Sequence, residues 1–455
     1  MPPGGVDKKI IILGGLIVVF IIALVLFLIF GRKSSKPEST ASSSNQLVIW
    51  DSFDGEEDLS DIITEYKRLN PDTDVTFVKK NPATYETESV NAIAEGKGPD
   101  IWIIPSDWMA KHHEKLAALA DNRLDPKHKE ANSKFYKDTY LDVAYKDNVI
   151  SDKVYGIPLF VDSLSLYLNT GLLDSKYQDY VKAHRNVNTR ELKNVFNQAP
   201  KTWDDLTTLI KFYGYGAIAL GSADNVDLSG DILAALMLQY GAQMNSNDQK
   251  SALFHTASNQ FSDLAYPGTK ALSFYTSFAQ KDNPNYTWDR KEKSAYEAFK
   301  NGQVAILIDY AEQAKKIEQD SNRSTQIAPL PQIKDSQNKI DLAYYQVLTV
   351  PKGSANSEKA WGFLTFLYNN PSLYKQYGTR TELASPLKEE TKNSTDALDI
   401  QNNFSSSWYN PDPAKADKIF KSAINQVLDG QKPQTAIDGA AAEISALLQK
   451  LSEEQ

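Results

Sequence analysis

The chain of 455 residues contains no cysteine. This absence excludes disulfide bridges, thiolate metal sites and cysteine nucleophiles, and it excludes membrane attachment through an acylated cysteine. It leaves the cellular compartment open. The rest of the composition, with 41% hydrophobic and 11% aromatic residues, is that of a folded protein. The length allows two or three domains.

Catalytic and metal-binding motifs are also missing. There is no G-x-S-x-G nucleophile elbow, no G-x-x-x-x-G-K-[ST] phosphate loop and no H-E-x-x-H zinc helix. The five histidines are scattered, apart from the adjacent His112 and His113 before Glu114. These two lack the i, i+4 spacing that places two imidazoles on one helix face, so we predict a solvated surface cluster. The sequence therefore predicts no catalytic residue, no metal site and no cofactor.

A basic surface is missing as well. The formal net charge is −9 at pH 7. The first 46 residues hold more basic than acidic side chains, so the body that follows is more acidic than the whole chain. An acidic body without a basic stripe argues against a nucleic-acid partner and against a protein that lies flat on anionic lipid.

One long apolar run lies near the N-terminus. Residues 10–30 are uncharged and almost wholly apolar, which is enough for a helix to cross about 30 Å of hydrocarbon. The motif Gly31-Arg32-Lys33 follows directly, without the small-residue cleavage site of a signal peptide. We therefore expect a short tail at 1–9 and a retained transmembrane anchor at 10–30, with a cleaved signal as the alternative. Basic residues flank the run on both sides and leave its orientation open.

A change of pattern separates this run from the body. Residues 31–46 are rich in serine and predict a flexible linker. Beyond them, strands are expected at 47–50, 75–78 and 100–104, each followed by a helix. Strands joined by helices imply a parallel sheet with right-handed crossovers. A second α/β unit follows, with a buried strand at 217–220 and another at 304–309.

The stretch from Val154 to Asn169 predicts two short β segments with a break between them. Gly156 and Pro158 interrupt the first segment, and the second alternates between apolar and polar residues. Asp162 lies at the break, where a carboxylate among apolar neighbours is costly unless it is paired or hydrated. On these residues alone, the stretch is either a strand that leaves one core and enters another, or an edge strand with one solvated aspartate.

Aromatic and acidic residues gather at the carboxyl ends of the expected strands, where open α/β sheets bind ligands. Flat rings pack on the C–H faces of a sugar, and carboxylates and amides bond to its hydroxyls. Each aromatic alone is more often a core residue, and tyrosine-rich surfaces also bind peptides. The candidates from this pattern are Trp50, Asp51, Phe53, Trp102, Asp107, Trp108 and Tyr310.

Several short motifs occur in a fixed order over residues 47–451. They are Ile93-Ala-Glu-Gly-Lys-Gly-Pro-Asp-Ile101, Tyr155-Gly-Ile-Pro158, Pro200-Lys-Thr-Trp-Asp-Asp205, Ala298-Phe-Lys-Asn-Gly-Gln-Val-Ala-Ile306, Ile327-Ala-Pro-Leu-Pro331, Ala360-Trp-Gly-Phe363 and Val427-Leu-Asp-Gly430. Each motif is weak alone, and the series is specific. It resembles the extracellular solute-binding proteins of ABC importers, in particular the sugar-binding branch typified by maltose-binding protein.

The resemblance implies an α/β fold of the two-lobed periplasmic-binding-protein kind, type II-like, with mixed sheets and hinged lobes. The first lobe would comprise residues 47–157 and 325–375, and the second residues 158–324 and 376–455. The chain would cross between the lobes near 156–161 and again near 327–350. Closure of the lobes would then enclose a ligand.

The resemblance also carries ligand contacts onto this sequence. They fall on the turn with Trp50, Asp51 and Phe53, on the turn after Ile104, on Asp162 and Tyr310, and more loosely on 221–229, Trp408 and Tyr409. Two departures from the family pattern concern bulk: Tyr310 stands where a glycine is frequent, and Tyr344 and Tyr345 stand in a segment that is commonly small. Their side chains would narrow the cleft.

The leading hypothesis from the sequence is a membrane-tethered extracytoplasmic protein that captures a small polar solute, most plausibly a carbohydrate, for an ABC permease. One alternative is a sensor whose lobes present the bound ligand to a receptor, and a more remote one is an anchored glycan hydrolase. Under the leading hypothesis, Trp50→Ala or Tyr310→Ala is expected to weaken ligand binding and to leave the fold intact.

Overall fold

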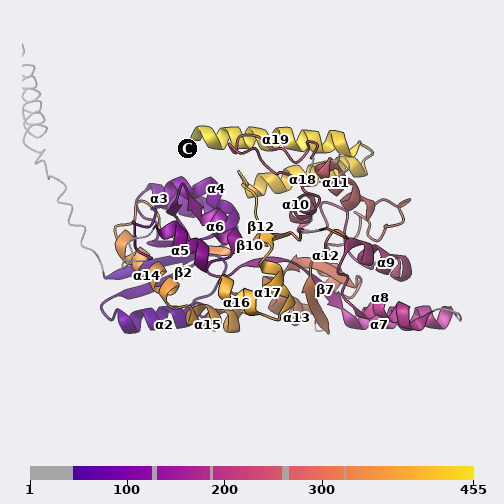
Figure 1. Cartoon of the computed structure of the whole chain (residues 1–455), viewed down its shortest axis with the longest axis horizontal. Coiled ribbons are helices and arrows are strands. Elements are labelled where there is room, and N and C mark those ends of the chain that lie inside the picture. Colours follow the sequence, from indigo (N-terminus) through magenta and orange to yellow (C-terminus); the bar gives the residue numbers. More distant parts are fainter. Residues whose placement is uncertain are drawn as a thin grey trace, which may run out of the picture. The chain divides into compact units, whose positions relative to one another are not determined.

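The computed structural model describes residues 45–454 except 125–130, 185–187, 259–265, 322–323 and 337. The predicted anchor at 10–30 and nearly all of the predicted linker lie outside these residues. Within the described part of the chain, no helix is long and apolar enough to cross a membrane. The described body has two α/β lobes, each with its own sheet and hydrophobic core (Figure 1).

The first lobe is built on a five-stranded mixed sheet. The strand order is β2 (Asp74–Lys79), β1 (Gln46–Asp51), β3 (Ile101–Pro105), β11 (Gln346–Thr349) and β6 (Gly156–Pro158). Strand β1 runs parallel to β2 and β3, as the alternation of strands and helices predicted. Strand β11 is antiparallel to both β3 and β6. The apolar run of β3 is buried on both faces, as is typical of a central strand.

Helices pack around this sheet. They are α2 (Ser60–Leu69), α3 (Tyr85–Ala94), η1 (Ser106–Trp108), α4 (Met109–His112), η2 (His113–Lys115), α5 (Asn132–Thr139), α6 (Asp142–Asn148), α14 (Ser357–Asn369) and α15 (Ser372–Thr381). The small hairpin of β4 (Val149–Ile150) and β5 (Lys153–Val154) follows α6. The apolar face of α2 packs on α14, where the Tyr66 ring lies 4.8 Å from Phe363. The helical segment after β3 ends at Lys115, because Leu116 is extended and pairs with Pro351.

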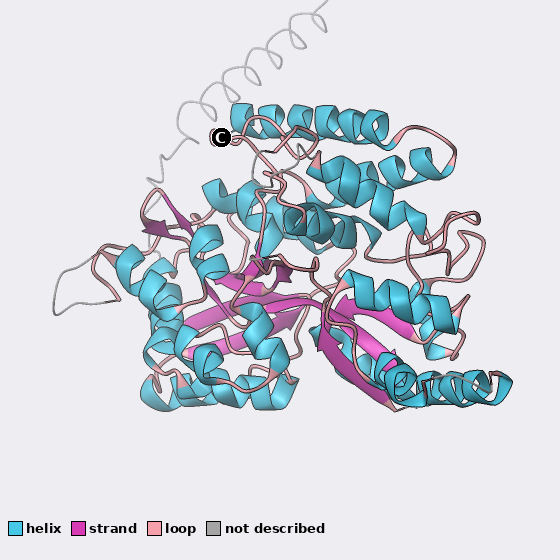
Figure 2. Ribbon diagram, turned by 45° about the vertical axis from the view of Figure 1, so that its right-hand side comes forward, coloured by secondary structure: helices cyan, strands magenta, loops and turns pink. Residues whose placement is uncertain are grey.

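The second lobe is organised around the long strand β7 (Asp162–Asn169), which is buried along its whole length. It pairs antiparallel with β8 (Ile306–Tyr310), β9 (Thr325–Pro329) and β10 (Asp341–Tyr344), and β10 pairs parallel with β12 (Ser405–Ser406). The strand predicted at 217–220 is reduced to one bridge, Ile218 with Ile306. Figure 2 shows the strands of both sheets among the helices.

The helices of the second lobe cover its sheet and form a separate bundle. They are α7 (Thr170–Ala183), α8 (Thr189–Asn197), α9 (Trp203–Tyr213), α10 (Ser229–Gln239), α11 (Pro267–Ser277), α12 (Ala295–Lys300), η3 (Ala311–Gln313), α13 (Ala314–Ser321), α17 (Ala397–Asn402), α18 (Pro413–Leu428) and α19 (Pro433–Glu454). Helix α10 is apolar and buried almost all round, which makes it the centre of the bundle. Helix α9 begins with a capping box between Thr202 and Asp205.

The first crossing between the lobes lies at residues 159–161, between β6 and β7. The stretch from Val154 to Asn169 therefore leaves one core and enters another, as one of its two interpretations predicted. The edge-strand alternative is wrong, because β7 is flanked on both sides and Asp162 is only 3% exposed.

The second crossing falls within the range 327–350 expected for it, but it and the third crossing differ from the predicted lobe boundaries at 325 and 376. The second crossing is the single residue Tyr345, between β10 and β11, so residues 325–344 belong to the second lobe and not to the first. The third lies around α16 (Lys388–Asn393), because Tyr377, Leu383 and Leu387 are part of the first core. The pattern of a strand predicts that the strand pairs, but it does not predict which sheet the strand joins. The lobe boundary at 325 was therefore placed too early in the sequence.

Candidate ligand-binding site

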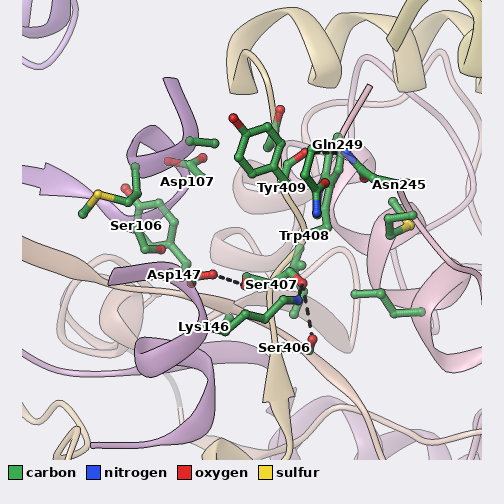
Figure 3. Close-up of a pocket in the computed structure, with 18 of the residues that line it drawn as sticks. Ser106, Asp107, Lys146, Asp147, Asn245, Gln249, Ser406, Ser407, Trp408 and Tyr409 are labelled. Carbon is green, nitrogen blue, oxygen red and sulfur yellow. Dashed lines mark hydrogen bonds between the residues drawn. The ribbon is translucent and has the colours of Figure 1, made fainter. Parts of the chain in front are cut away.

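A cavity of about 710 Å³ lies between the two lobes (Figure 3). Its first-lobe wall comes from η1, α4, α6 and β4, and its second-lobe wall from α10, the loop at 242–249, and the ends of β8 and β10. The segment 406–410, which leads from β12 to α18, completes the lining. Small-ligand pockets typically have volumes of about 300–1,000 Å³.

Aromatic rings form much of the second-lobe wall. The Tyr310 and Tyr344 rings lie 5.2 Å apart and inclined by 35°. Trp408 and Tyr409 stand beside each other in the close-up, and the Trp408 ring packs 6.0 Å from Phe420 of α18. The contact with Phe420 and the position of β12 fix the direction of the Trp408 ring, which leaves part of it at the cavity.

Carboxylates face this wall from both lobes. Asp231, in the first turn of α10, accepts a hydrogen bond of 3.0 Å from the Tyr310 hydroxyl. Burial raises the pKa of the Asp231 carboxyl to about 6, although the Tyr310 bond opposes the shift. Asp147 of α6 accepts from the Tyr345 hydroxyl at 2.8 Å and from the Ser407 hydroxyl.

Asp107 is the carboxylate with the fewest partners. It lies in η1, directly after the carboxyl end of β3, and lines the cavity from the first lobe. Its Oδ1 atom is buried and has no hydrogen-bond partner among the described residues. Burial, reinforced by the negative charge of Asp231, raises the pKa of the Asp107 carboxyl to about 7.

Amide side chains supply further polar groups on the second-lobe side. Asn245 donates to the backbone carbonyl of Tyr409 at 2.9 Å, and its own Oδ1 is buried without a partner in the described structure. Gln249 lies nearby at the rim, and Figure 3 shows both amides across the cavity from Asp107. An unsatisfied amide oxygen and an unsatisfied carboxylate oxygen can both accept from hydroxyl or amino donors of a ligand.

The structure brings five of the predicted site residues together at this cavity. They are Asp107, Tyr310, Tyr344, Trp408 and Tyr409. They come from both lobes and from segments about 300 residues apart in the sequence, which is the arrangement that a cleft between hinged lobes requires.

Four predicted residues belong to β1, to the turn after it or to the neighbouring strand β3, and none of them lines the cavity. The Trp50 ring is covered by the Lys80 ammonium, 3.7 Å from the ring centre, and Phe53 stacks on Phe160. Asp51 is fully buried and accepts from the backbone N–H groups of Phe53 and Asp54, as a turn residue does. Trp102 is fully buried in the first core.

Three further predicted residues also take structural positions. Trp108 packs against Trp102 with ring centres 6.2 Å apart. Tyr345 is fully buried and anchors the second crossing through its bond to Asp147. Asp162 accepts from the backbone N–H groups of Ala311 and Glu312, so its carboxylate fixes the start of η3, and it is absent from the lining of the 710 Å³ cavity.

The prediction that the two adjacent histidines lie on a solvated surface was wrong. His112 and His113 are only 3% and 7% exposed. His112 bonds to Glu86 at 2.8 Å and packs on Trp102, while His113 lines the cavity and bonds to the Ala110 carbonyl. Among the residues that the structure describes, no group of three or more histidines and carboxylates is placed to hold a metal ion.

Sequence reasoning missed Asp147, Asp231 and Asn245. Asp231 stands in the first turn of a helix, where the helix dipole favours a carboxylate, so its presence there did not indicate a ligand site. Asp147 and Asn245 follow no strand, so the rule that ligands bind at the carboxyl ends of strands could not identify them. Only the packing of α6 and of the loop at 242–249 against the second crossing brings these polar groups to the cavity.

Comparisons with known proteins give relatives of one kind. Residues 53–374 match the family described as bacterial extracellular solute-binding protein. The chain is 21% identical over 425 residues to the maltotriose-binding protein of Pyrococcus abyssi, which covers 90% of this chain and 82% of that protein. It is 24% identical over 147 residues to the galactooligosaccharide-binding protein of Bacillus subtilis, a match that covers 32% of each chain.

Solved structures share the fold. The binding protein for cyclic alpha-maltosyl-1,6-maltose from Arthrobacter globiformis has a TM-score of 0.71 at 16% identity, over 89% of this chain and 99% of that one. The sugar-binding protein MalE of Xanthomonas citri has a TM-score of 0.68 at 16% identity, over 89% and 98%. At such identities the likeness establishes the two-lobed fold alone.

Proposed function

The chain belongs to the family of bacterial extracellular solute-binding proteins, as its motif series predicted, and we propose that it captures a carbohydrate between its two lobes. The observation that carries this proposal is the cavity between the lobes, with aromatic rings on one side and hydrogen-bonding side chains on the other. The residues proposed to contact the sugar are Asp107, Tyr310, Tyr344, Trp408 and Tyr409, together with Asp231 and Asn245.

The wall fits the chemistry of a sugar. The C–H faces of a pyranose ring pack on flat aromatic rings, as Trp408 and the pair of Tyr310 and Tyr344 offer. Its hydroxyl groups donate to the free acceptors of Asp107 and Asn245. The names of the relatives, which bind maltotriose and galactooligosaccharides, support an oligosaccharide as the ligand.

Closure of the lobes would complete the site. The first lobe supplies Asp107 and the second supplies the rings, so a ligand gains its full set of contacts only when both lobes reach it. An ion-pair bridge joins the two lobes: Lys111 of α4 pairs with Glu86 at 2.7 Å and with Asp412, the N-cap of α18, at 3.3 Å. This bridge supports a closed arrangement as the capturing state.

Delivery to an ABC permease is the expected role of the captured sugar, as for the family. We place the body on the extracytoplasmic side of the cell membrane, held by residues 10–30 as a single-pass anchor. The proposal is a binding protein and not an enzyme, since the relatives named above are binding proteins.

Isothermal titration of the body from residue 45 onward tests the proposal. Maltotriose and a galactotriose are the first two probes, and a tripeptide of similar size is the control for a peptide site. We expect one sugar to bind with a Kd in the micromolar range, which corresponds to about −8 kcal/mol. A ligand at 100 times its Kd should stabilise the fold by about 2.7 kcal/mol in thermal unfolding. Binding of the peptide with neither sugar bound would overturn the proposal.

A further inference from the structure

The charged side chains of the cavity are unbalanced. Its described lining includes the carboxylates Asp107, Asp147 and Asp231, and Asp248 at the rim, against one basic side chain, Lys146. The Lys146 ammonium donates to the Ser407 carbonyl at 2.6 Å and is itself exposed. His113 is held by the Ala110 carbonyl and by Glu114. No basic group of the described lining therefore faces Asp107 or Asp231 across the cavity.

The carboxylates differ in how far the protein satisfies them. Asp147 accepts two hydroxyl bonds, and Asp248 accepts from Ser246 and from a backbone N–H at the surface. Asp231 accepts one bond, from Tyr310, although a carboxylate has about four acceptor positions. Asp107 has a buried oxygen with no partner in the described chain. The unsatisfied acceptors are therefore concentrated on Asp107 and Asp231.

These two carboxylates lie on opposite lobes and interact electrostatically. The charge of Asp231 is the strongest charged influence on Asp107, and both act on the Tyr310 hydroxyl. Like charges repel, and the charge of Asp231 adds to burial in raising the pKa of the Asp107 carboxyl, whereas the raised pKa of Asp231 comes from burial and from the charge of Asp417. Closure around a neutral ligand would remove water from both groups and leave the repulsion in place.

We propose that the ligand of this cavity is an amino sugar, whose protonated amine lies between Asp107 of the first lobe and Asp231 of the second. This inference rests on the proposed function and specifies the class of sugar. An ammonium group has three donors and no acceptor, so it satisfies the free oxygen of Asp107 and an open position on Asp231 together. Its positive charge cancels the repulsion between the lobes.

The aromatic wall suits the same ligand. The Tyr310 ring carries the hydroxyl that bonds to Asp231, and the Tyr344 ring lies 5.2 Å from it. The two rings beside Asp231 therefore give the carbon skeleton of the amino sugar an apolar surface next to the carboxylate that holds its amine. The ring faces alone would accept any sugar, whereas the carboxylate pair selects for charge.

The test compares sugars that differ only in the amine. The probes are the pairs glucosamine and glucose, galactosamine and galactose, and chitobiose (the glucosamine dimer) and cellobiose, with the N-acetylated dimer as a neutral analogue of similar bulk. Titration calorimetry is done at a pH at which the amines are protonated. We expect the aminated member of at least one pair to bind ten times or more tighter than its neutral counterpart, and the dimer also to bind ten times or more tighter than its N-acetylated analogue.

Variants then locate the preference. Asp107→Asn and Asp231→Asn keep the shape of each side chain and remove its charge, and each should reduce the preference for the amine at least fivefold. Asp429→Asn is the matched control, because Asp429 at the C-terminal end of α18 lies in the same lobe as Asp231, pairs with Arg290 and is absent from the cavity lining. It should leave the preference within twofold. Thermal unfolding establishes that each variant is folded.

The outcomes separate the two proposals. Neutral sugars that bind as tightly as their amines overturn the amino-sugar inference and leave the proposed function standing. Failure of every sugar, neutral or aminated, overturns both. A preference for the amine that survives in both Asp107→Asn and Asp231→Asn contradicts the position of the ammonium between these two carboxylates.

Discussion

The Tyr310 hydroxyl donates to the Asp231 carboxylate across 3.0 Å, and this bond joins the end of β8 to the first turn of α10. Tyr310 is 6% exposed, so the bond lies at the floor of the cavity and out of bulk water. A buried hydrogen bond to a charged acceptor is stronger than one between neutral groups. The bulk of Tyr310 therefore narrows the cleft and also positions a carboxylate within it.

Tyr310→Phe is expected to destabilise the fold by about 1–2 kcal/mol, because it removes the hydroxyl that donates to the partly buried Asp231 carboxylate. Urea unfolding at neutral pH measures the change. Tyr344→Phe is the matched control: it removes the same atom from the adjacent ring, whose hydroxyl has only a long contact of 3.4 Å from Gln346. Equal destabilisation of the two variants would contradict the importance of the Asp231 bond.

Trp408→Ala is expected to weaken sugar binding at least tenfold with little loss of stability, since the ring lines the cavity and packs on Phe420 from one side only. Trp50→Ala is the control, although the sequence alone led us to expect that this substitution weakens ligand binding. The Trp50 ring lies under Lys80 and outside the lining, so its removal should leave the affinity within twofold. Titration calorimetry with the same sugar decides between the two.

Lys111→Met is expected to increase the rate of ligand release about threefold to tenfold, because it breaks the bridge from α4 to Asp412. The association rate should change less, and stopped-flow fluorescence of the cavity tryptophan separates the two rates. Lys67→Met is the comparison variant. Its pair with Asp74 has the same length of 3.3 Å but lies within the first lobe, so ligand release should be unaffected.

The pH dependence of stability should carry the signature of Asp162. Burial raises the pKa of this carboxyl from 3.8 to about 7, so the folded state holds its proton more tightly than the unfolded state between these values. Stability is therefore lost as the pH rises through this window. We expect Asp162→Asn to remove about 2 kcal/mol of the decline between pH 5 and pH 8.

Asp248→Asn is the control for this effect. Hydrogen bonds from Ser246 and from the Lys250 backbone lower the pKa of the Asp248 carboxyl, so it does not titrate between pH 5 and pH 8. Its replacement should leave the slope of stability against pH unchanged. An unaltered slope in Asp162→Asn, measured by urea unfolding at several pH values, would contradict the raised pKa of that group.

Local patterns predicted most of the elements. The alternation over 47–104 predicted the parallel unit of β1, β2 and β3, and the pattern of 154–169 predicted the crossing between the two cores as one of its two interpretations. These features depend on residues a few positions apart. The partner of a strand depends on distant residues, and β9 and β10 both pair with β7, more than 150 residues earlier in the chain. Their lobe was therefore predicted incorrectly.

The candidate site was predicted in part for a similar reason. The position of a residue at the carboxyl end of a strand predicts the edge of the sheet at which it lies. It does not predict the face of the sheet toward which its side chain points. Trp102 is in register with Trp50, and both pack within the first lobe, whereas Asp107 reaches the cavity from the helical turn beyond the strand. Asp147 and Asp231 come from helices, and only the packing of the two lobes gives them a common cavity.

The first two crossings run side by side as an antiparallel ribbon. Strands β6 and β11 pair in one sheet, their continuations β7 and β10 pair in the other, and the Leu159 N–H bonds to the Gln346 carbonyl at 2.9 Å between them. Bending such a ribbon within its plane would shear the bonds between its strands, whereas flexing it across its face preserves them. The connection thus leaves the lobes essentially one soft degree of freedom, a rotation about an axis that lies in the plane of the ribbon and across its strands.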